Sequence, residues 1–171
     1  MSKDKQKSEP ESPPEIRRRV RFKKYQIVGL PFLFAIPVLA SFGVFDSSRA
    51  MASASNKDIS LEVAYYDRLR DDAPEPITIV AKNSSQSPLS QLKVQLERSC
   101  VGGQKKPQMR PEPNEIDERF VTFVFDNVPP GESRIVEIDA EVGLAGTHEG
   151  QIQASAGGEP VSVRIKTFAF P

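Results

Sequence analysis

"ISLEVAYY", residues 59–66, carries an apolar side chain at every second position in its first half. Ile59, Leu61 and Val63 alternate with Ser60 and Glu62. Successive side chains of a β-strand point to opposite faces, so this period of two predicts a strand with one buried face. Six later stretches show similar patterns, namely residues 77–82, 92–97, 120–125, 136–142, 151–156 and 161–166.

Turn residues separate these seven predicted strands. The stretch VPPGES, residues 128–133, offers Pro and then Gly, which suit a tight turn, and GLAGT and GGEP supply later corners. No stretch after residue 59 shows helical spacing long enough to compete. Seven short strands with such turns are typical of a seven-stranded antiparallel Ig-like β-sandwich, which we predict over residues 59–171.

Three stretches of this predicted domain resemble the CARDB-type immunoglobulin-like domains of bacterial and archaeal envelope proteins. They are VAKNSSQSPLSQLKVQL (residues 80–96), NVPPGES (residues 127–133) and GTHEGQIQA (residues 146–154). The whole layout, with a basic tail, one apolar stretch and one such domain, is similar to small single-pass bacterial membrane proteins. The resemblance implies adhesion or protein contact, and it carries over no functional residues.

The apolar stretch YQIVGLPFLFAIPVLASFGVF, residues 25–45, holds no charged side chain. As a helix it would reach about 31 Å, close to the thickness of the hydrocarbon layer of a bilayer. Pro31 and Pro37 would break a soluble helix but are tolerated in lipid, so we predict an uncleaved transmembrane helix rather than a buried core helix. A cleaved signal sequence stays an alternative, because small-residue cleavage sites end at Ala52 and at Ala54.

Basic residues gather immediately before the apolar stretch. Residues 1–24 carry nine Lys or Arg against four Asp or Glu, whereas the chain after residue 45 is net acidic. Because Lys and Arg favour the cytoplasmic side, we predict a protein of the inner cell membrane with a cytoplasmic N-terminus and an extracytoplasmic, periplasmic C-terminal domain. The membrane-flanking basic residues are Arg17, Arg18, Arg19, Arg21, Lys23 and Lys24. Topology accounts for this cluster, so we expect no nucleic-acid partner.

Two polar segments flank the apolar stretch. Residues 1–24 are charged and poor in apolar side chains, so they predict a disordered basic cytoplasmic tail. Residues 46–58 are rich in Ser and Ala and predict a flexible linker. The predicted order is therefore tail, transmembrane helix (25–45), linker and β-sandwich domain (59–171).

The sequence offers few groups for catalysis. It has one cysteine, Cys100, which excludes a disulfide within the chain, and one histidine, His148. It contains no Gly-rich phosphate loop, nucleophile elbow or paired-carboxylate motif. Asp71 and Asp72 share a loop, where solvated charges are the ordinary case. We therefore predict a non-enzymatic protein without a cofactor.

The loop SCVGGQKKPQMRPEPNEIDER, residues 99–119, is the most informative part of the domain, because long structureless loops in compact domains are often functional. One hypothesis is copper or thiol handling, since Cys100 and Met109 are soft ligands that suit Cu(I) and His148 could complete the site. A plain surface loop with an incidental thiol is the simpler interpretation. The other hypothesis is a partner-docking loop, with Cys100, Met109, Arg110, Glu112 and Asp117 as candidate contact residues.

These features predict a membrane-anchored, non-enzymatic extracytoplasmic domain. It would act in protein–protein contact or as an accessory or scaffold subunit of an envelope complex, with another envelope or membrane protein as its partner. An exposed strand edge beside the loop is a second place where a partner could bind. The alternative function is an envelope copper or thiol factor that uses Cys100 and Met109.

Overall fold

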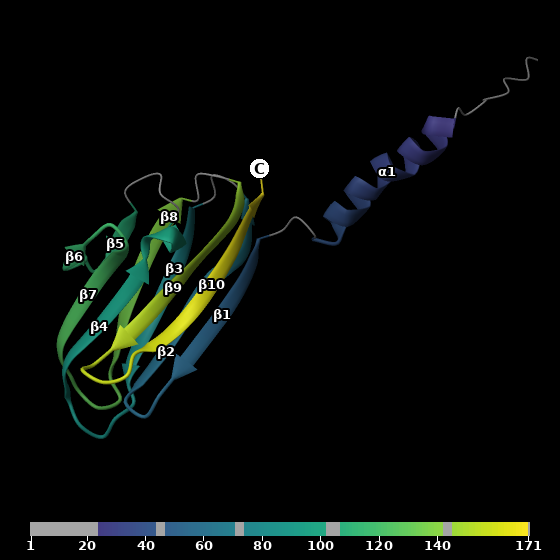
Figure 1. Ribbon diagram of the computed structural model, residues 1–171. Helices are drawn as coiled ribbons and strands as arrows, with labels where there is room; N and C mark the ends of the chain where they lie inside the picture. Colours follow the sequence, from purple (N-terminus) through teal and green to yellow (C-terminus); the bar gives the residue numbers. More distant parts are fainter. Residues whose placement is uncertain (1–23, 44–46, 71–73, 102–106, 142–144, 171) are drawn as a thin grey trace, which may run out of the picture. The chain divides into compact units, whose positions relative to one another are not determined.

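The computed structural model describes residues 24–43, 47–70, 74–101, 107–141 and 145–170 (Figure 1). These residues fall into two compact units, an N-terminal unit that ends at Phe42 and a β domain that begins at Gly43. Several predicted residues lie outside the described ranges, namely Arg17, Arg18, Arg19, Arg21, Lys23, Asp71 and Asp72.

The N-terminal unit contains one helix, α1 (Lys24–Ser41). Its 18 residues rise about 27 Å, and the chain turns at Gly43, whose φ is 69°. The helix therefore ends before the predicted apolar stretch does. No helix within the described ranges combines the length and the apolar character that a bilayer crossing needs, so the predicted transmembrane helix over residues 25–45 is wrong.

The described part of the β domain holds ten strands and one short 3-10 helix, η1. The strands are β1 (Ser48–Ser55), β2 (Ile59–Arg70), β3 (Pro74–Asn83), β4 (Leu89–Glu97), β5 (Gln108–Arg110), β6 (Glu115–Ile116), β7 (Phe120–Val128), β8 (Ser133–Glu141), β9 (Gly146–Ser155) and β10 (Val161–Phe170), and η1 spans Arg98–Val101. Strands β2 to β4 and β7 to β10 match the seven stretches in which the sequence shows a period of two, although two of those stretches were predicted to run one residue beyond the ends of β8 and β9.

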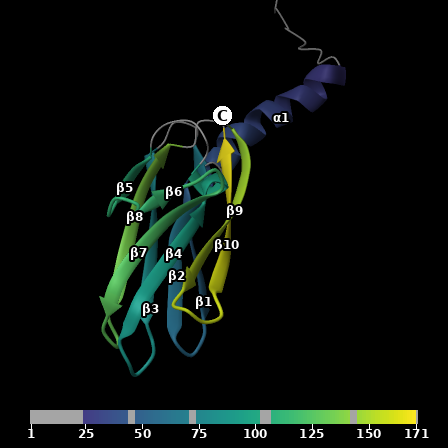
Figure 2. The same ribbon diagram turned by 60° about the vertical axis from the view of Figure 1, so that its left-hand side comes forward.

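All ten strands belong to one mixed sheet that curls into a half-barrel (Figure 1, Figure 2). The order along the sheet is β5-β8-β3-β2-β10-β9-β4-β7-β6, and β1 pairs with β2. Neighbouring strands are antiparallel except β2 and β10, which run parallel where Phe168 lies beside Arg68 and Ala169 beside Leu69. The predicted seven-stranded antiparallel Ig-like β-sandwich is therefore wrong, because the strands form one connected mixed sheet.

Strand β2 makes this connection because it is 12 residues long and changes partner along its length. Residues 59–64 pair with β3, and residues 68–70 pair with β10. The alternation of apolar side chains shows which face of a strand is buried, but it does not show which strand lies beside it. The sequence pattern therefore located the strands without revealing the parallel junction.

The hydrophobic core lies inside the curl, where the inward side chains of the strands meet. Its largest side chains with less than 2% exposure include Phe123, Ile59, Leu61, Ile79, Leu92, Leu96, Ile138 and Ile152. Fully burying one such side chain stabilises the fold by about 1.5–3 kcal/mol. Because both halves of the sheet contribute, this packing holds the curl closed over a single core.

Asn83, at the end of β3, forms hydrogen bonds that fix the loop between β3 and β4 and the end of β7. Its side-chain amide donates hydrogen bonds to the carbonyl oxygens of Ser87 and Val128, each at 2.9 Å. Its Oδ1 accepts a hydrogen bond from the backbone N–H of Ser85 at 2.9 Å. A buried amide needs such partners, so the stretch that suggested a CARDB-type domain has a structural role here.

Strand β1 lies in the stretch that we predicted as a flexible linker. Its side chains alternate between half-buried and exposed, and Ala52 and Ala54 pack against the core. The linker prediction is therefore wrong for residues 48–55, because small Ala and Ser side chains hide the period of two. Cleavage at the possible signal sites after Ala52 or Ala54 would sever this strand.

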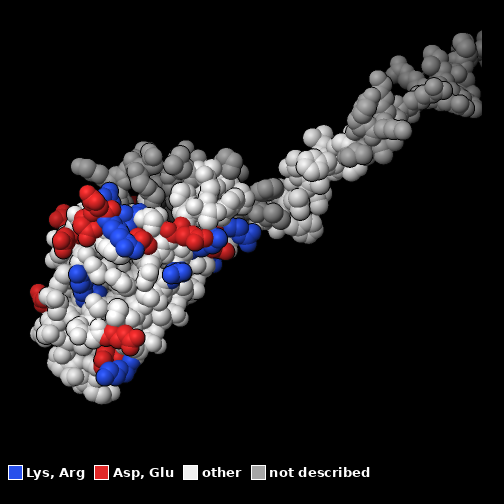
Figure 3. Space-filling model, viewed as in Figure 1, with Lys and Arg blue, Asp and Glu red and all other residues white. Residues whose placement is uncertain are grey.

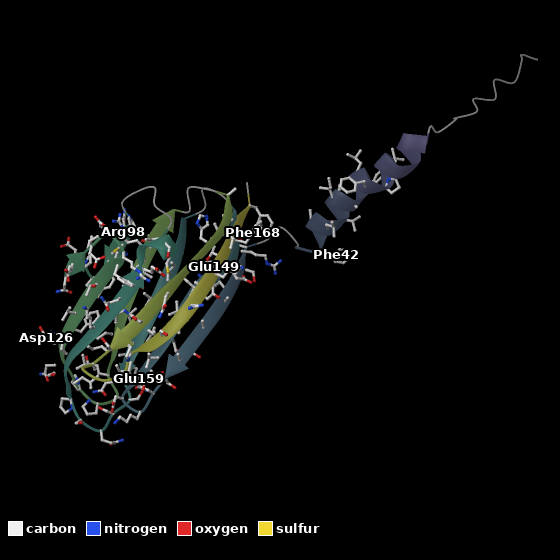
Figure 4. All side chains as sticks on the ribbon, in the orientation of Figure 1. Phe42, Arg98, Asp126, Glu149, Glu159 and Phe168 are labelled. Atoms are coloured by element: carbon white, nitrogen blue, oxygen red, sulfur yellow. The ribbon has the colours of Figure 1, made fainter. Side chains whose placement is uncertain are left out.

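The far end of β1 is tied to the turn between β9 and β10. The side-chain amide of Asn56 donates a hydrogen bond to the carbonyl oxygen of Glu159 at 3.0 Å, and Glu159 is labelled at that turn in Figure 4. The Oδ1 atom of Asn56 also accepts hydrogen bonds from the backbone N–H groups of Asp58 and Ile59. These bonds fix the β1–β2 turn and hold β1 in register.

Residues 107–119, which we call the edge strap, follow the outer strands of the sheet. Within the strap, β5 pairs with β8 and β6 pairs with β7. Strands β7 and β8 lie near opposite ends of the strand order, so the strap runs from one end of the curled sheet to the other. The strap therefore covers part of the edges that the curl leaves open.

Candidate functional site

Cys100 lies in η1 and is buried, with 8% of its surface exposed. Burial, and next the nearby carboxylate of Glu97, raise the pKa of the Cys100 thiol to about 12. Its Sγ atom lies 3.9 Å from the carbonyl oxygen of Gln151 on β9. A buried protonated thiol is neither a good nucleophile nor a ready metal ligand, so its position favours a role in packing.

Gly150 on β9 makes room for this thiol. A Cβ atom at residue 150 would collide with the Sγ of Cys100 and would lie 2.7 Å from the Oγ of Ser99 and 3.0 Å from the backbone N of Cys100. Only glycine lets η1 approach the strand this closely. The start of the predicted functional loop is therefore a packed part of the core.

The other two residues of the copper hypothesis lie on different strands. Met109 is half-buried on β5, where it pairs with Ile138 of β8 and packs against the core. His148 is half-buried on β9, opposite Thr167 of β10. Within the described ranges, no three His, Cys, Asp or Glu side chains come together in a way that could hold a metal ion. The structure thus gives the copper hypothesis no assembled donor set.

The remaining residues of the predicted docking loop belong to the edge strap. Arg110 and Glu112 are exposed, and Arg110 lies opposite Glu137 of β8. Asp117 accepts hydrogen bonds at Oδ1 from the backbone N–H groups of Phe120 at 2.5 Å and Arg119 at 2.7 Å. These hydrogen bonds, with that from Phe120 the larger, lower the pKa of Asp117. Asp117 therefore acts as a cap that fixes the entry into β7.

The middle of the face formed by β4, β7 and β9 holds uncharged polar side chains that bind one another, and Lys93 and Glu97 flank Gln95 on the same face of β4. Gln95 donates a hydrogen bond from Nε2 to Oγ1 of Thr122 at 3.3 Å, and Gln153 donates one from Nε2 to Oε1 of Gln95 at 3.0 Å. Figure 3 shows charged side chains dense toward the end where η1, β5 and β6 lie, and further charged side chains at the opposite end of the β domain. Gln95, Thr122 and Gln153 therefore already have hydrogen-bond partners on this face.

Strand β1 presents a different kind of surface. Within the described residues it pairs with β2 alone, so its second edge has no pairing strand there, although β10 packs near β1 and the β1–β2 ladder has a register shift between Ser48 and Arg49. Its sequence, SRAMASAS, has one charged side chain and no proline. Natural proteins usually protect such edges with charges, prolines or bulges, because an open edge readily pairs with another strand.

The one charge on this strand is held by β2. Arg49 donates a hydrogen bond from Nε to the hydroxyl oxygen of Tyr66 at 2.7 Å, and its Cζ lies 5.0 Å from the centre of the Tyr66 ring. Tyr66 pairs with Arg49 across the β1–β2 ladder, on the side away from the open edge. The guanidinium of Arg49 thus lies on the β2 side of β1. Its charge therefore does not protect the open edge of β1 against pairing with another strand.

The other edges of the sheet are shorter or carry more charge. Strands β5 and β6 have three and two residues, and they cover part of β8 and β7. On β10, residues 161–167 pair with β9 only, and Arg164 and Lys166 are exposed there, with Lys166 bound to Glu149 of β9 at 2.6 Å. Among the described strands, β1 is therefore the longest edge with so little charge.

Large apolar side chains are exposed in both units. Among the described residues of the β domain, Met51 of β1 is the most exposed at 76%, followed by Ile116, Ile135 and Phe168. Figure 4 labels Phe168 near the end of β10 and Phe42 just after α1. The exposed apolar side chains of the helical unit are Leu30, Phe32, Leu33, Phe34, Ile36, Val38, Leu39 and Phe42. Surfaces of this kind mark sites that bind proteins or membranes.

Comparisons with known proteins give no support to the predicted family. No protein-family model matches the chain, and no curated protein sequence does. Among solved structures, the chain resembles BslA, described as a bacterial hydrophobin, at TM-score 0.41 and 11% identity over 73% of this chain and 95% of that one. It also resembles the β-glucosidase EmGH1 of Erythrobacter marinus at TM-score 0.34 and 11% identity, over 72% of this chain and 16% of the enzyme.

The predicted resemblance to CARDB-type domains is therefore wrong. The ten described strands form one curled mixed sheet, which differs from a CARDB-type sandwich, and no family model matches the chain. Likenesses this distant carry no functional residues and no activity over to this chain.

The open edge of β1 is the feature that sequence reasoning missed. Its weak signal is the spacing of Ala50, Ala52 and Ala54, which are half-buried while Met51 and Ser53 between them are exposed. Ala and Ser side chains differ little in hydropathy, so their alternation is hard to detect. The sequence of residues 48–55 therefore resembles that of a flexible linker. A test for period two that scores size as well as hydropathy could find it.

Proposed function

We propose that this chain is a non-enzymatic contact protein whose β domain takes up a further β-strand along the open edge of β1. The observation that carries the proposal is that β1 has eight residues, pairs only with β2 among the described strands, and has its one charged side chain, Arg49, bound to Tyr66. Strand addition uses main-chain hydrogen bonds for affinity and alternate side chains for specificity.

The geometry of β1 supports this mode of binding. The inward side chains of Ala50, Ala52 and Ala54 are small, and the outward side chains of Ser53 and Ser55 are small as well. An incoming strand lies about 4.8 Å from its neighbour, and nothing in these side chains obstructs that distance. Met51, exposed at the middle of the strand, supplies an apolar contact beside the new ladder.

The location outside the cytoplasm also remains part of the proposal. Six basic residues between Arg17 and Lys24 precede the apolar stretch, and a basic segment followed by an apolar one is typical of chains that are directed out of the cytoplasm. Protease added to intact spheroplasts should then digest the β domain, while a cytoplasmic control protein survives. Protection of both proteins would contradict this location.

A photoreactive amino acid at residue 53 tests the contact function. Ser53 is exposed on β1, so in the full chain, in its native cells, we expect irradiation to give one discrete adduct. The matched control is residue 78, because Thr78 lies on β3, which is paired on both sides. An adduct of equal yield from both positions, or none from residue 53, would contradict the proposal.

A further inference from the structure

We propose that the strand taken up by β1 is the β1 strand of a second copy of this chain, paired antiparallel about a two-fold axis at Met51. This inference rests on the proposed function, since it names the partner of the same edge. Two copies with the same open edge form a closed, self-complementary contact when the axis passes between their edges.

The register follows from the alternation of the two faces. Opposite residues in an antiparallel pair point to the same face of a sheet. With Met51 opposite Met51, Ala50 lies opposite Ala52 of the second copy, so inward positions meet inward positions. Arg49 then lies opposite Ser53, so outward positions meet outward positions.

This register covers the most exposed large apolar side chain of the β domain. Met51 is 76% exposed in the single chain, and at the axis the two methionines shield each other from water. Methionine adapts well to such contacts, because its unbranched side chain changes shape easily. The position of Met51 at the middle of β1 is what makes a second copy fit better than an unrelated strand.

Charge does not oppose the pairing. Each β1 strand has one charged residue, Arg49, and in this register the two arginines lie four residues apart along the ladder, about 14 Å. At physiological salt, charges at that separation are largely screened. Each guanidinium is also bound to Tyr66 of its own chain, which draws it away from the axis.

Cysteine crosslinking of the full chain tests the register. In Met51→Cys the two thiols meet at the axis, and mild oxidation with oxidised glutathione should join two chains by a disulfide. Cys100 is buried, so it stays out of this reaction. The control is Ile135→Cys, since Ile135 is also exposed, at 53%, but lies on the outer face of β8. We expect at least about tenfold more crosslinked dimer from Met51→Cys, because β1 pairing holds those thiols together.

Charge substitution at the same position gives a second test that does not depend on a disulfide. Met51→Lys and Met51→Glu each place like charges opposite each other, so each variant alone should self-associate about tenfold more weakly. Mixing the two variants should restore association, because Lys then faces Glu. The readout is the yield of the dimer adduct from a photoreactive amino acid at residue 53 in each variant, rather than particle mass, because α1 also exposes apolar side chains.

The outcomes separate this inference from the proposed function. A disulfide through residue 51 with restored pairing in the Lys–Glu mixture supports the second copy. If residue 53 captures a different protein and Met51→Cys gives no more dimer than Ile135→Cys, the second copy is wrong and the contact function stands. If residue 53 captures nothing, both proposals fail.

Discussion

Arg49 and Tyr66 form a stacked, hydrogen-bonded pair across the β1–β2 ladder. The Nε of Arg49 lies 2.7 Å from the hydroxyl oxygen of Tyr66, and its Cζ lies 5.0 Å from the ring centre. Because the pair lies on the β2 side of β1, the charge of Arg49, the only charged residue of β1, is held away from the open edge. This relationship is the structural reason why β1 can accept another strand.

Removing the Tyr66 hydroxyl should weaken this pair while keeping the ring. In Tyr66→Phe the hydrogen bond is lost and the stacking stays, so we expect the free energy of unfolding to fall by about 0.5–1 kcal/mol. Urea unfolding measures the change. Tyr65→Phe is the control, since the Tyr65 hydroxyl has no hydrogen bond within the described residues. Equal effects of the two substitutions would contradict the importance of the Arg49 pair.

Gly150→Ala should destabilise the β domain. The new Cβ would collide with the Sγ of Cys100 and approach its backbone N to 3.0 Å, so η1 must move away from β9. Overpacking of this kind costs about 1–3 kcal/mol, which thermal or urea unfolding would detect.

Gly158→Ala is the matched control for this substitution. Gly158 lies in the turn before β10, and a Cβ atom there has nothing within 4 Å. We expect Cys100→Ala to rescue part of the Gly150→Ala defect, because it removes the colliding sulfur but leaves the backbone N in place. Equal stability losses at residues 150 and 158 would show that η1 does not lie against β9.

The buried thiol of Cys100 should make stability depend on pH in the alkaline range. Its pKa rises from an ordinary value of 9.0 to about 12, so the folded state favours the protonated thiol. This contribution is fully present below pH 9 and is lost as the pH rises from 9 toward about 12.

Comparison with Cys100→Ala isolates this effect from other groups that titrate at high pH. The stability advantage of the native chain over Cys100→Ala, measured by urea unfolding, should be smaller at pH 11 than at pH 8. The thiol should also resist alkylation until the chain is unfolded. An advantage that stays constant across this range, together with rapid alkylation of the folded chain, would mean that the thiol is accessible.

Asp117 should lose its capping role at low pH. Hydrogen bonds from the backbone N–H groups of Phe120 and then Arg119 lower its pKa below the ordinary 3.8. Its stabilising effect is therefore present above pH 3.8 and disappears as the pH falls through the lowered pKa.

Residue-specific NMR would follow this cap. The amides of Arg119 and Phe120 should exchange faster in Asp117→Ala than in the native chain, whereas Asp117→Asn, which keeps an acceptor oxygen, should exchange at an intermediate rate. Glu112→Ala is the control, because Glu112 is exposed in the strap. Unchanged exchange of both amides in Asp117→Ala would rule out the cap.

The sequence predicted which face of each strand is buried better than it predicted which strands pair with each other. The alternation of Ile59, Leu61 and Val63 marks a buried face correctly, since all three lie in the core. Nothing in that alternation shows that β2 continues to Arg70 and pairs in parallel with β10. Pairing depends on contacts between distant segments, which local periodicity does not encode.

The candidate site was harder to predict for a different reason. Cys100 and Met109 drew attention because soft ligands are rare in this chain, but both side chains pack against the core. Ala52 and Ser53 were not predicted to lie on a strand, because small side chains resemble those of a linker. An open edge is a property of the backbone and of missing neighbours, so side-chain chemistry alone gives little sign of it.

Amide hydrogen exchange of β1, followed by NMR in the full chain at low and high protein concentration, tests the central claim most directly. If the open edge takes up the β1 strand of a second copy, every second amide between Ser48 and Ser55 should gain protection as the concentration rises, because only alternate N–H groups point to that edge. Protection of these amides that does not change with concentration, while the chains associate elsewhere, would contradict the account.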